Sequence, residues 1–378
     1  MTTVHVMRPW LGAEEVAAVT EVLASGWVAQ GPRVAAFERA FGVSQHAAHA
    51  VALSSCTAAL HLSLVVAGVR PGDDVVVPSF SFVATANAVV HAGARPVFAD
   101  VDLVTGNVTA GTVEAALTPR TTAVVAVDQG GVPVDLDALR ALTDPLGVVV
   151  VEDAACAAGS TYRGGPVGAR SEVAAWSFHP RKVLTTGEGG MLTTHREDWA
   201  QRARRLREHA MSVSAADRHA SLLAPPEEYL EVGFNYRMTD LQAAVGLVQL
   251  GRLPEAVARR RALAAAYAEQ LADLPWLRPV ADPPWGTGNF QSYWVEVLPG
   301  APVDRDGLLA RLAAADVSAR RGIMAAHRQP AYAGGDHGPA PLPVTERLTD
   351  RTLILPLFHE LAEDDQARVV DALRAAER

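Results

Sequence analysis

Lys182 is the only lysine in a chain of 378 residues; Lys and Arg together number 33, so the other 32 are arginine. An arginine serves as well as a lysine in an ion pair or an anion site, but it stays protonated and cannot attack a carbonyl group. The retained lysine therefore indicates a position where an amine nucleophile is needed. Chance survival of one lysine is the alternative. The glycine-punctuated neighbours at 177–190 favour a site for Schiff-base chemistry instead.

An aspartate follows a strongly apolar strand pattern. The valines at 148–151 are typical of a strand buried on both faces, and they run into Glu152 and Asp153. Ligands of an open parallel sheet bind beyond the carboxyl ends of its strands, so we expect Asp153 at a binding site. An Asp at this position upstream of Lys182 suits pyridoxal 5′-phosphate (PLP), because a carboxylate keeps the pyridine nitrogen protonated. The alternative role for Asp153 is a helix N-cap.

A turn of small residues leads from the strand pattern at 50–53 into a helical pattern. It carries Ser55, Cys56 and Thr57. Backbone N–H groups at a helix N-terminus, together with hydroxyl groups, bind phosphate, so these residues are candidate phosphate ligands. Simple capping of the helix by Ser55 or Thr57 is the alternative.

The elements that must position these residues alternate along the first two thirds of the chain. Short β-branched runs alternate with Ala- and Leu-rich helical patterns, which predicts an α/β fold with a mostly parallel central sheet wrapped by helices. Strands are predicted at 50–53, 74–77, 96–99, 122–127, 148–151, 173–178 and 190–194. Helices are predicted at 13–23, 34–41, 57–67 and 197–209, and an irregular stretch at 211–229.

A smaller α+β domain is predicted at the C-terminal end. A capping box at 239–242 opens a helix through about residue 250, and a longer helix follows Pro254. The Pro-, Trp- and Gly-rich stretch at 275–288 is expected to precede the second sheet. One of its strands is predicted at 292–298, and helices at 305–315 and 364–376. The domains are accordingly 1–250, with the N-terminal segment included, and 251–378.

Composition excludes several classes of function. Hydrophobic residues make up 49% of the chain and charged residues 20%, as in a globular protein with a large core. The net charge is −9 and the arginines are scattered, so no basic domain for nucleic acid is expected. The sequence shows neither the charged and then apolar pattern of a secretory signal peptide nor an apolar run long enough to span a membrane. We therefore expect a cytoplasmic protein that does not bind a membrane. Two cysteines, Cys56 and Cys156, build no disulfide framework, and no Cys/His spacing predicts a metal site.

Five segments of the chain together resemble a known family. They read Ser-Ser-Cys-Thr-Ala-Ala-Leu at 54–60, Pro-Ser-Phe-Ser-Phe-Val-Ala-Thr at 78–85, Val-Glu-Asp-Ala-Ala at 151–155, Ser-Phe-His-Pro-Arg-Lys with Gly-Glu-Gly-Gly at 177–190, and Gly-Phe-Asn-Tyr-Arg-Met-Thr at 233–239. In this order and spacing they resemble the DegT/DnrJ/EryC1/StrS family of PLP-dependent sugar aminotransferases. The resemblance runs from residues 8–12 to residues 353–357 and implies PLP fold type I, the aspartate-aminotransferase fold.

The resemblance implies a role for each matching cofactor residue. Lys182 would form the Schiff base and then carry the proton between substrate and cofactor, and Asp153 would pair with the ring nitrogen. Phe82 would stack on the ring, although a phenylalanine in such a segment is more often part of a core. Asn235 would reach the phosphate of a neighbouring subunit, which implies a homodimer with shared active sites.

The same resemblance implies the remaining phosphate contacts and identifies two departures. The backbone at Cys56 and Thr57, with the hydroxyl of Ser177, would hold the phosphate. The family usually has Gly where Cys56 stands, a change that backbone contacts tolerate. It often has Gln or His where Cys156 stands, bonded to the ring hydroxyl of the cofactor. Because a thiol is a weak donor, that contact is lost here or made by another group.

Three residues are candidate substrate ligands. His179 lies beside the cofactor in similar proteins, and a surface histidine without a ligand is the alternative. Arg321 and His327 belong to a segment that resembles the substrate region of the family, where arginines could meet a diphosphate. An exposed basic turn is the alternative for that segment.

The resemblance implies a PLP-dependent aminotransferase that moves an amino group from an amino acid, L-glutamate, to a keto sugar, a nucleotide-linked keto-deoxyhexose. Family members that have become dehydratases replace the Schiff-base lysine with histidine, so the presence of Lys182 favours amino transfer. Two alternatives stay open. One is the same chemistry on a keto-cyclitol or another biosynthetic ketone, and the other is a PLP-binding regulator without turnover.

Overall fold

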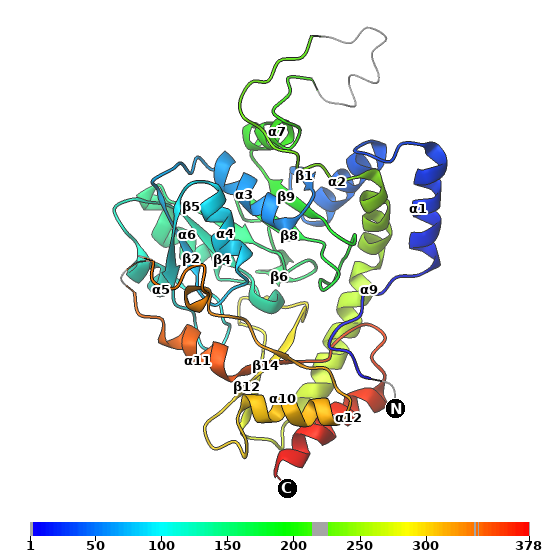
Figure 1. Cartoon of the computed structure of the whole chain (residues 1–378), viewed down its shortest axis with the longest axis vertical. Helices are drawn as coiled ribbons and strands as arrows, with labels where there is room; N and C mark the ends of the chain where they lie inside the picture. Colours follow the sequence, from blue (N-terminus) through cyan, green and yellow to red (C-terminus); the bar gives the residue numbers. More distant parts are fainter. Residues whose placement is uncertain (1–2, 214–225, 336–337, 339, 378) are drawn as a thin grey trace.

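The computed structural model describes residues 3–213, 226–335, 338 and 340–377 (Figure 1). Its centre is a seven-stranded sheet of order β1-β9-β8-β5-β4-β2-β3. Neighbouring strands among β8, β5, β4, β2 and β3 pair in parallel, and β9 runs antiparallel to both β8 and β1. The prediction of a mostly parallel sheet is therefore confirmed. The strands are β1 (His49–Leu53), β2 (Asp74–Pro78), β3 (Arg95–Ala99), β4 (Thr121–Val127), β5 (Val149–Asp153), β8 (Val173–Ser177) and β9 (Gly190–Thr194).

The valine-rich strands are buried on both faces because helices cover both sides of the sheet. Alternate side chains of one strand enter different cores, as Val76 joins one apolar cluster and Val75 and Val77 join the other. One face is covered by α2 (Pro32–Ser44), α5 (Ala110–Ala116), α6 (Leu136–Thr143) and part of α9 (Asp240–Gln270), and α1 (Ala13–Ser25) packs against α9. The other face is covered by α3 (Cys56–Val66), α4 (Ala84–His91) and α7 (Glu197–Leu206).

A second, four-stranded sheet forms the smaller C-terminal unit, at the bottom of Figure 1. All its pairs are antiparallel, which confirms the α+β expectation. Its elements are β10 (Leu277–Pro279), β12 (Tyr293–Val297), β13 (Arg320–Arg321) and β14 (Thr352–Leu355), with α10 (Arg305–Ala314), α11 (Pro343–Arg351) and α12 (Glu363–Arg374). A third, small sheet consists of β6 (Thr161–Tyr162), β7 (Gly165–Pro166) and β11 (Gly286–Thr287). Single 3-10 turns are η1 (Gln129–Gly131), η2 (Asp144–Leu146), η3 (Ala326–Arg328) and η4 (Ala375–Glu377).

The predicted break between two helices near Pro254 is wrong. A single helix, α9, runs from Asp240 to Gln270 with Pro254 inside it. A proline removes one backbone hydrogen bond, but α9 packs against α1 and α2 before the proline and against α12 of the smaller unit. This packing keeps the helix continuous. The capping box at its start is as predicted, since Thr239 Oγ1 accepts from the N–H of Gln242 at 3.3 Å.

Other predicted boundaries shift by a few residues. Strand β5 extends to Asp153, two residues beyond its predicted end, and α7 ends at Leu206. The predicted irregular stretch at 211–229 includes 214–225, which lie outside the described residues. The N-terminal segment, which we grouped with the large domain, bonds to the smaller unit: Val4 N–H donates to Asp316 O at 2.9 Å. The predicted domain boundary at residue 250 falls inside α9.

Candidate functional site

Lys182 lies in the loop that joins the antiparallel strands β8 and β9. The loop is closed at its base, where Phe178 N–H donates to Gly189 O at 2.9 Å and Thr186 N–H donates to Phe178 O at 3.0 Å. Lys182 N–H donates to His179 O at 2.8 Å, which forms a tight turn at the lysine. The side chain is half-buried, and its Nζ lies 3.1 Å from Cys156 Sγ. The lysine amine is thus held against the loop that follows β5.

Asp153 is the last residue of β5 and is only 3% exposed. Its carboxylate accepts from Thr85 Oγ1 at 3.0 Å and from the N–H of Ala155 at 3.2 Å. Burial raises the pKa of Asp153, while these two donors and the charge of Lys182 oppose that shift. The residues after Asp153 form turns and no helix, so the N-cap alternative is not realised.

The N-terminus of α3 faces the same end of the sheet. Ser55 is its N-cap and accepts from Ala58 N–H at 3.2 Å, as the capping alternative predicted. The first helical hydrogen bond is made by Ala59 N–H, so the N–H groups of Cys56 and Thr57 precede the hydrogen-bonded part of the helix. Such groups are suited to an anion.

Ser177, the last residue of β8, lies near the N-terminus of α3 because its partner in β9 packs against that terminus. Ser177 pairs with Gly190, and a Cβ added to Gly190 would lie 2.4 Å from the carbonyl of Ser55. Only glycine permits this close approach of the β9 backbone to the α3 N-terminus. The predicted phosphate residues Ser55, Cys56, Thr57 and Ser177 therefore gather in one place.

Phe82 and Arg321 line one cavity of about 400 Å³, between the end of the large sheet and the smaller unit. Phe82 is 62% exposed, so its ring is not part of a core. Arg181, the neighbour of Lys182, also lines this cavity, and its carbonyl accepts from Gln291 Nε2 at 2.9 Å. Another cavity of about 460 Å³, between α2 and α7, contains none of the predicted site residues.

Asn235 is exposed and forms a β-bridge with Glu208. Its segment is attached to the end of β1, where Tyr236 O accepts from Ser54 N–H at 2.8 Å. Three large apolar side chains precede it in the chain and are strongly exposed: Tyr229 at 62%, Leu230 at 57% and Val232 at 88%.

The other candidate substrate residues make protein contacts. His179 Nδ1 accepts from the N–H of Arg181 at 3.1 Å, and its Nε2 lies 3.8 Å from Glu188. Arg321 is paired with Asp306 at 3.1 Å on the rim of the 400 Å³ cavity.

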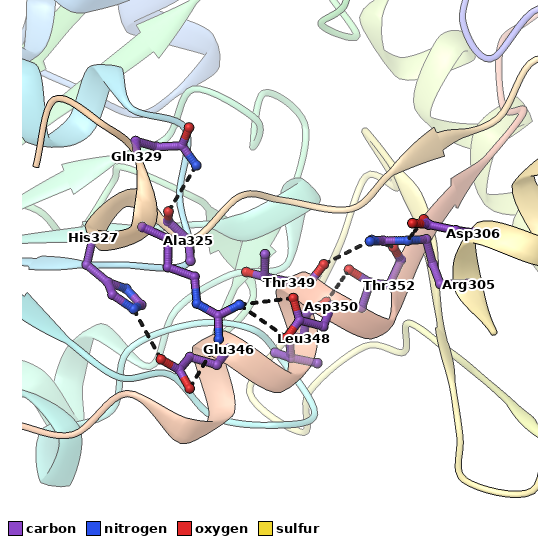
Figure 2. Close-up of polar contacts among 11 residues, drawn as sticks. Arg305, Asp306, Ala325, His327, Gln329, Glu346, Leu348, Thr349, Asp350 and Thr352 are labelled. Atoms are coloured by element: carbon purple, nitrogen blue, oxygen red, sulfur yellow. Dashed lines mark hydrogen bonds and ion pairs between the residues drawn. The ribbon is translucent and has the colours of Figure 1, made fainter. Parts of the chain in front are cut away.

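His327 contacts residues of both units. Its Nδ1 lies 2.7 Å from Ser79 Oγ, and Figure 2 shows its ring directed at Glu346 of α11, 3.4 Å from Nε2. The start of η3 and the residue after β2 are joined here, because Ala326 N–H donates to Ser79 O at 2.7 Å. The contacts of His327 are those of a residue that joins the smaller unit to the end of β2.

Two residues without a predicted role support the site. Thr85 donates to Asp153, although it stood in the quoted segment 78–85 without an assigned function. Asn289 is fully buried, and its Nδ2 donates to the carbonyl oxygens of Cys156 and Ala158, both at 2.8 Å. No local pattern predicts Asn289, because its partners are more than 130 residues away in the sequence.

The residues present fit PLP. An amine at Lys182, a buried carboxylate at Asp153 and the N–H groups of α3 match the aldehyde, pyridine nitrogen and phosphate of that cofactor. Among the described residues, no group of His, Cys, Asp and Glu is arranged to hold a metal ion. The described helices also include none with the length and apolar character needed to cross a bilayer.

Comparison with known proteins assigns the family. The sequence pattern of the DegT/DnrJ/EryC1/StrS aminotransferase family matches residues 9–374. The aminotransferase TlmJ from Streptoalloteichus hindustanus is similar over 98% of both chains, with 39% identity and a TM-score of 0.90. DesI, solved in the presence of its TDP-sugar product, matches with 35% identity and a TM-score of 0.90, over 100% of this chain and 94% of its own.

A more distant relative has been solved in both cofactor forms. This relative is Spr1654 from Streptococcus pneumoniae, described as a sugar aminotransferase. Its PMP form matches this chain over 98% of both chains, with 26% identity and a TM-score of 0.91. Its PLP form matches with a TM-score of 0.89 over 98% of this chain and 97% of that one. On this evidence of sequence and fold, the chain belongs to the DegT/DnrJ/EryC1/StrS family and is a PLP-dependent aminotransferase.

Proposed function

We propose that this enzyme transfers the amino group of L-glutamate to a nucleotide-linked keto-deoxyhexose, with Lys182 as the Schiff-base residue. The observation that carries the proposal is the contact of the only lysine with the loop that follows buried Asp153. Bound PLP supplies an aldehyde that takes an amine covalently and a ring that accepts electrons from the adjacent carbon. The side chains must bind, orient and move protons.

Lys182 Nζ is the proton carrier in this proposal. A half-buried amine in a closed loop could take a proton from the substrate carbon on one side of the transferred nitrogen and deliver it to the carbon on the other side, because its backbone is fixed by the bonds at the base of the loop. Asp153 holds the ring nitrogen protonated, and Thr85 orients its carboxylate. Ser177 and the N–H groups of Cys56 and Thr57 anchor the phosphate, which fixes the ring relative to Lys182.

The 400 Å³ cavity is the proposed site of the acceptor. Three arginines line it, Arg181, Arg320 and Arg321, together with the exposed Phe82. Arginine binds the oxygens of a diphosphate through paired hydrogen bonds. The binding of a TDP-sugar by the similar DesI supports a nucleotide-linked acceptor for this enzyme as well.

Replacing Arg321 by Ala is expected to raise the KM for the nucleotide sugar about tenfold, the effect of one charge-assisted hydrogen bond, with little change in the reaction of L-glutamate. Its exposed ion pair with Asp306 is weak and can be exchanged for a phosphate. The matched control is Arg311→Ala, on the same unit but bonded to Ala375 O instead. Equal KM values for the two variants would remove Arg321 from the acceptor site.

Two half-reactions test the proposed function. Mixing the PLP form with L-glutamate should convert its absorbance to that of the pyridoxamine form, which a regulator without turnover would not do. The pyridoxamine form should then be reoxidised by a nucleotide-linked keto-deoxyhexose. Faster reoxidation by a keto-cyclitol would contradict the sugar proposal and leave amino transfer intact.

We further propose that the active unit is a homodimer in which Asn235 reaches the phosphate of the partner's cofactor. The exposure of Asn235 supports this, as does the exposure of Tyr229, Leu230 and Val232 close to it in the chain. An apolar cluster of this kind is typical of a covered surface. A monomer in sedimentation that remains fully active would contradict the proposal.

A further inference from the structure

Both cysteines of the sequence lie around the single lysine. Cys156 Sγ is 3.1 Å from Lys182 Nζ, and Cys56 interacts electrostatically with Lys182, Asp153 and Cys156. Both cysteine residues are partly buried. The amino-transfer chemistry proposed above uses the nitrogen of Lys182 and does not use the sulfur of Cys156. A sulfur this close to an amine can be joined to it if the sulfur is first oxidised.

We propose that Cys156 and Lys182 form an oxidation-dependent, reversible covalent link, a sulfenamide bond between Sγ and Nζ, when the lysine is not joined to cofactor. Hydrogen peroxide is the oxidant. The link would remove the only lysine amine in the chain and thereby prevent loading of PLP. Cys156 thus becomes a modification site that controls access of the cofactor to the enzyme.

The link forms in two steps. The thiolate of Cys156 attacks one peroxide oxygen, the O–O bond breaks, and sulfur is oxidised to sulfenic acid while hydroxide leaves. The lone pair of Lys182 Nζ then attacks that sulfur, the S–N bond forms and the S–O bond breaks. Hydroxide leaves and takes up the proton lost by nitrogen, so one thiol, one amine and one peroxide give the link and two waters. An added thiol attacks the sulfur, which returns the amine and leaves a mixed disulfide on Cys156, and a second added thiol then releases the Cys156 thiol as the two added thiols form a disulfide.

The position of Lys182 suits the second step, because its Nζ already lies 3.1 Å from the sulfur that it attacks. Burial has the largest effect on the pKa of Lys182 and lowers it, whereas the contact with Cys156 and the charge of Asp153 act in the opposite direction and leave the pKa above its ordinary value. Burial therefore favours the neutral amine, which is the form that attacks sulfur.

Cys56 is the competing partner, because a disulfide with Cys156 would also consume the sulfenic acid. Burial, followed by the charge of Asp153, raises the pKa of the Cys56 thiol well above its ordinary value. A thiol that stays protonated is a poor nucleophile. Cys56 also begins α3, whose backbone is fixed by the Ser55 cap, whereas the amine of Lys182 is already in contact with the sulfur.

The single lysine provides the test. Full-length protein, with cofactor bound or removed, is treated with dilute peroxide, quenched and unfolded without reductant, and then digested with a lysine-specific protease. Unmodified chain is cut only after Lys182. We expect cofactor-free protein to lose the mass of two hydrogens, to resist this cut and to regain it after thiol treatment. Protein with bound PLP should be protected; only this expectation rests on the proposed function, so failure of the acceptor assignment would leave the link itself intact.

Three variants separate the outcomes. Cys56→Ser should retain the mass loss and the resistance to cleavage, and Cys156→Ser should lose both. Lys182→Arg keeps both thiols but lacks the amine, so it should also show no loss of two hydrogens. If Cys156→Ser melts below the parent protein, Lys182→Arg takes its place in the mass measurement. A mass loss that disappears in Cys56→Ser while Lys182 stays cleavable would show a disulfide and overturn the proposal. Added oxygen on Cys156 with normal cleavage, or no modification at all, would overturn it equally.

Discussion

Replacing Lys182 by arginine is expected to lower kcat for amino transfer by at least about 10⁴-fold, the upper range for loss of a positioned acid–base group. The variant keeps a positive charge and a similar length, so it should fold and melt like the parent. A guanidinium group forms no Schiff base and carries no proton between substrate and cofactor. The measurement is the single-turnover conversion of bound PLP by L-glutamate, together with the melting temperature.

The matched control adds a lysine elsewhere. Arg196→Lys changes an exposed residue paired with Asp198 at 2.7 Å, and it should leave kcat unchanged. In the double variant, which has its only lysine at position 196, reduction with borohydride should attach no cofactor to the chain. Retained turnover in Lys182→Arg, or cofactor attached at position 196, would refute the assignment of the amine.

Replacing Asp153 by asparagine is expected to lower kcat about 10³-fold, with a much smaller change in the KM for L-glutamate. The residue is 3% exposed, and asparagine preserves its shape and its bond from Thr85 while removing the negative charge. Without that charge the ring nitrogen loses its proton, and the ring accepts electrons poorly. Stopped-flow absorbance of the glutamate half-reaction measures the step directly.

Glu152→Gln is the matched control, since it neutralises the adjacent buried carboxyl group of the same strand. Successive side chains of a strand point to opposite faces, and Glu152 bonds to Ser171 and not to Thr85. Burial raises the pKa of Glu152 to about 7, so a neutral side chain resembles a state it already populates. We expect kcat within about threefold of the parent, because the neutral form already makes up about half of the Glu152 side chains near pH 7. Equal losses in both variants would mean that charge at Asp153 has no special role.

Much of the large domain was predictable because its signals are local. The valine runs of β4 and β5, the small residues before α3 and the capping box at Thr239 each fix a strand or a helix end within a few residues. The contrast between one lysine and 32 arginines marked Lys182 without any structure. Asp153 followed from its place after a buried strand.

Where sequence prediction failed, long-range packing was decisive. A proline normally ends a helix, but Pro254 does not interrupt α9 because both ends of that helix are packed against other helices. The substrate role of His327 stays a prediction. Its contacts with Ser79 and Glu346 come from two different units, so no local pattern in the sequence could have indicated them.

The sequence by itself determined the chemical types at the site: one amine, one buried carboxylate after a strand, and a helix start of small residues. Only the tertiary structure decided which groups touch. Thr85 meets Asp153 across 68 residues of sequence, and Asn289 holds the Cys156 loop from 133 residues away. Cys156 contacts Lys182 for the same reason, because β5 and β8 are neighbours in the sheet. Residue periodicity encodes a local backbone conformation, whereas these contacts depend on strand order and on the closing of the two units over one sheet edge.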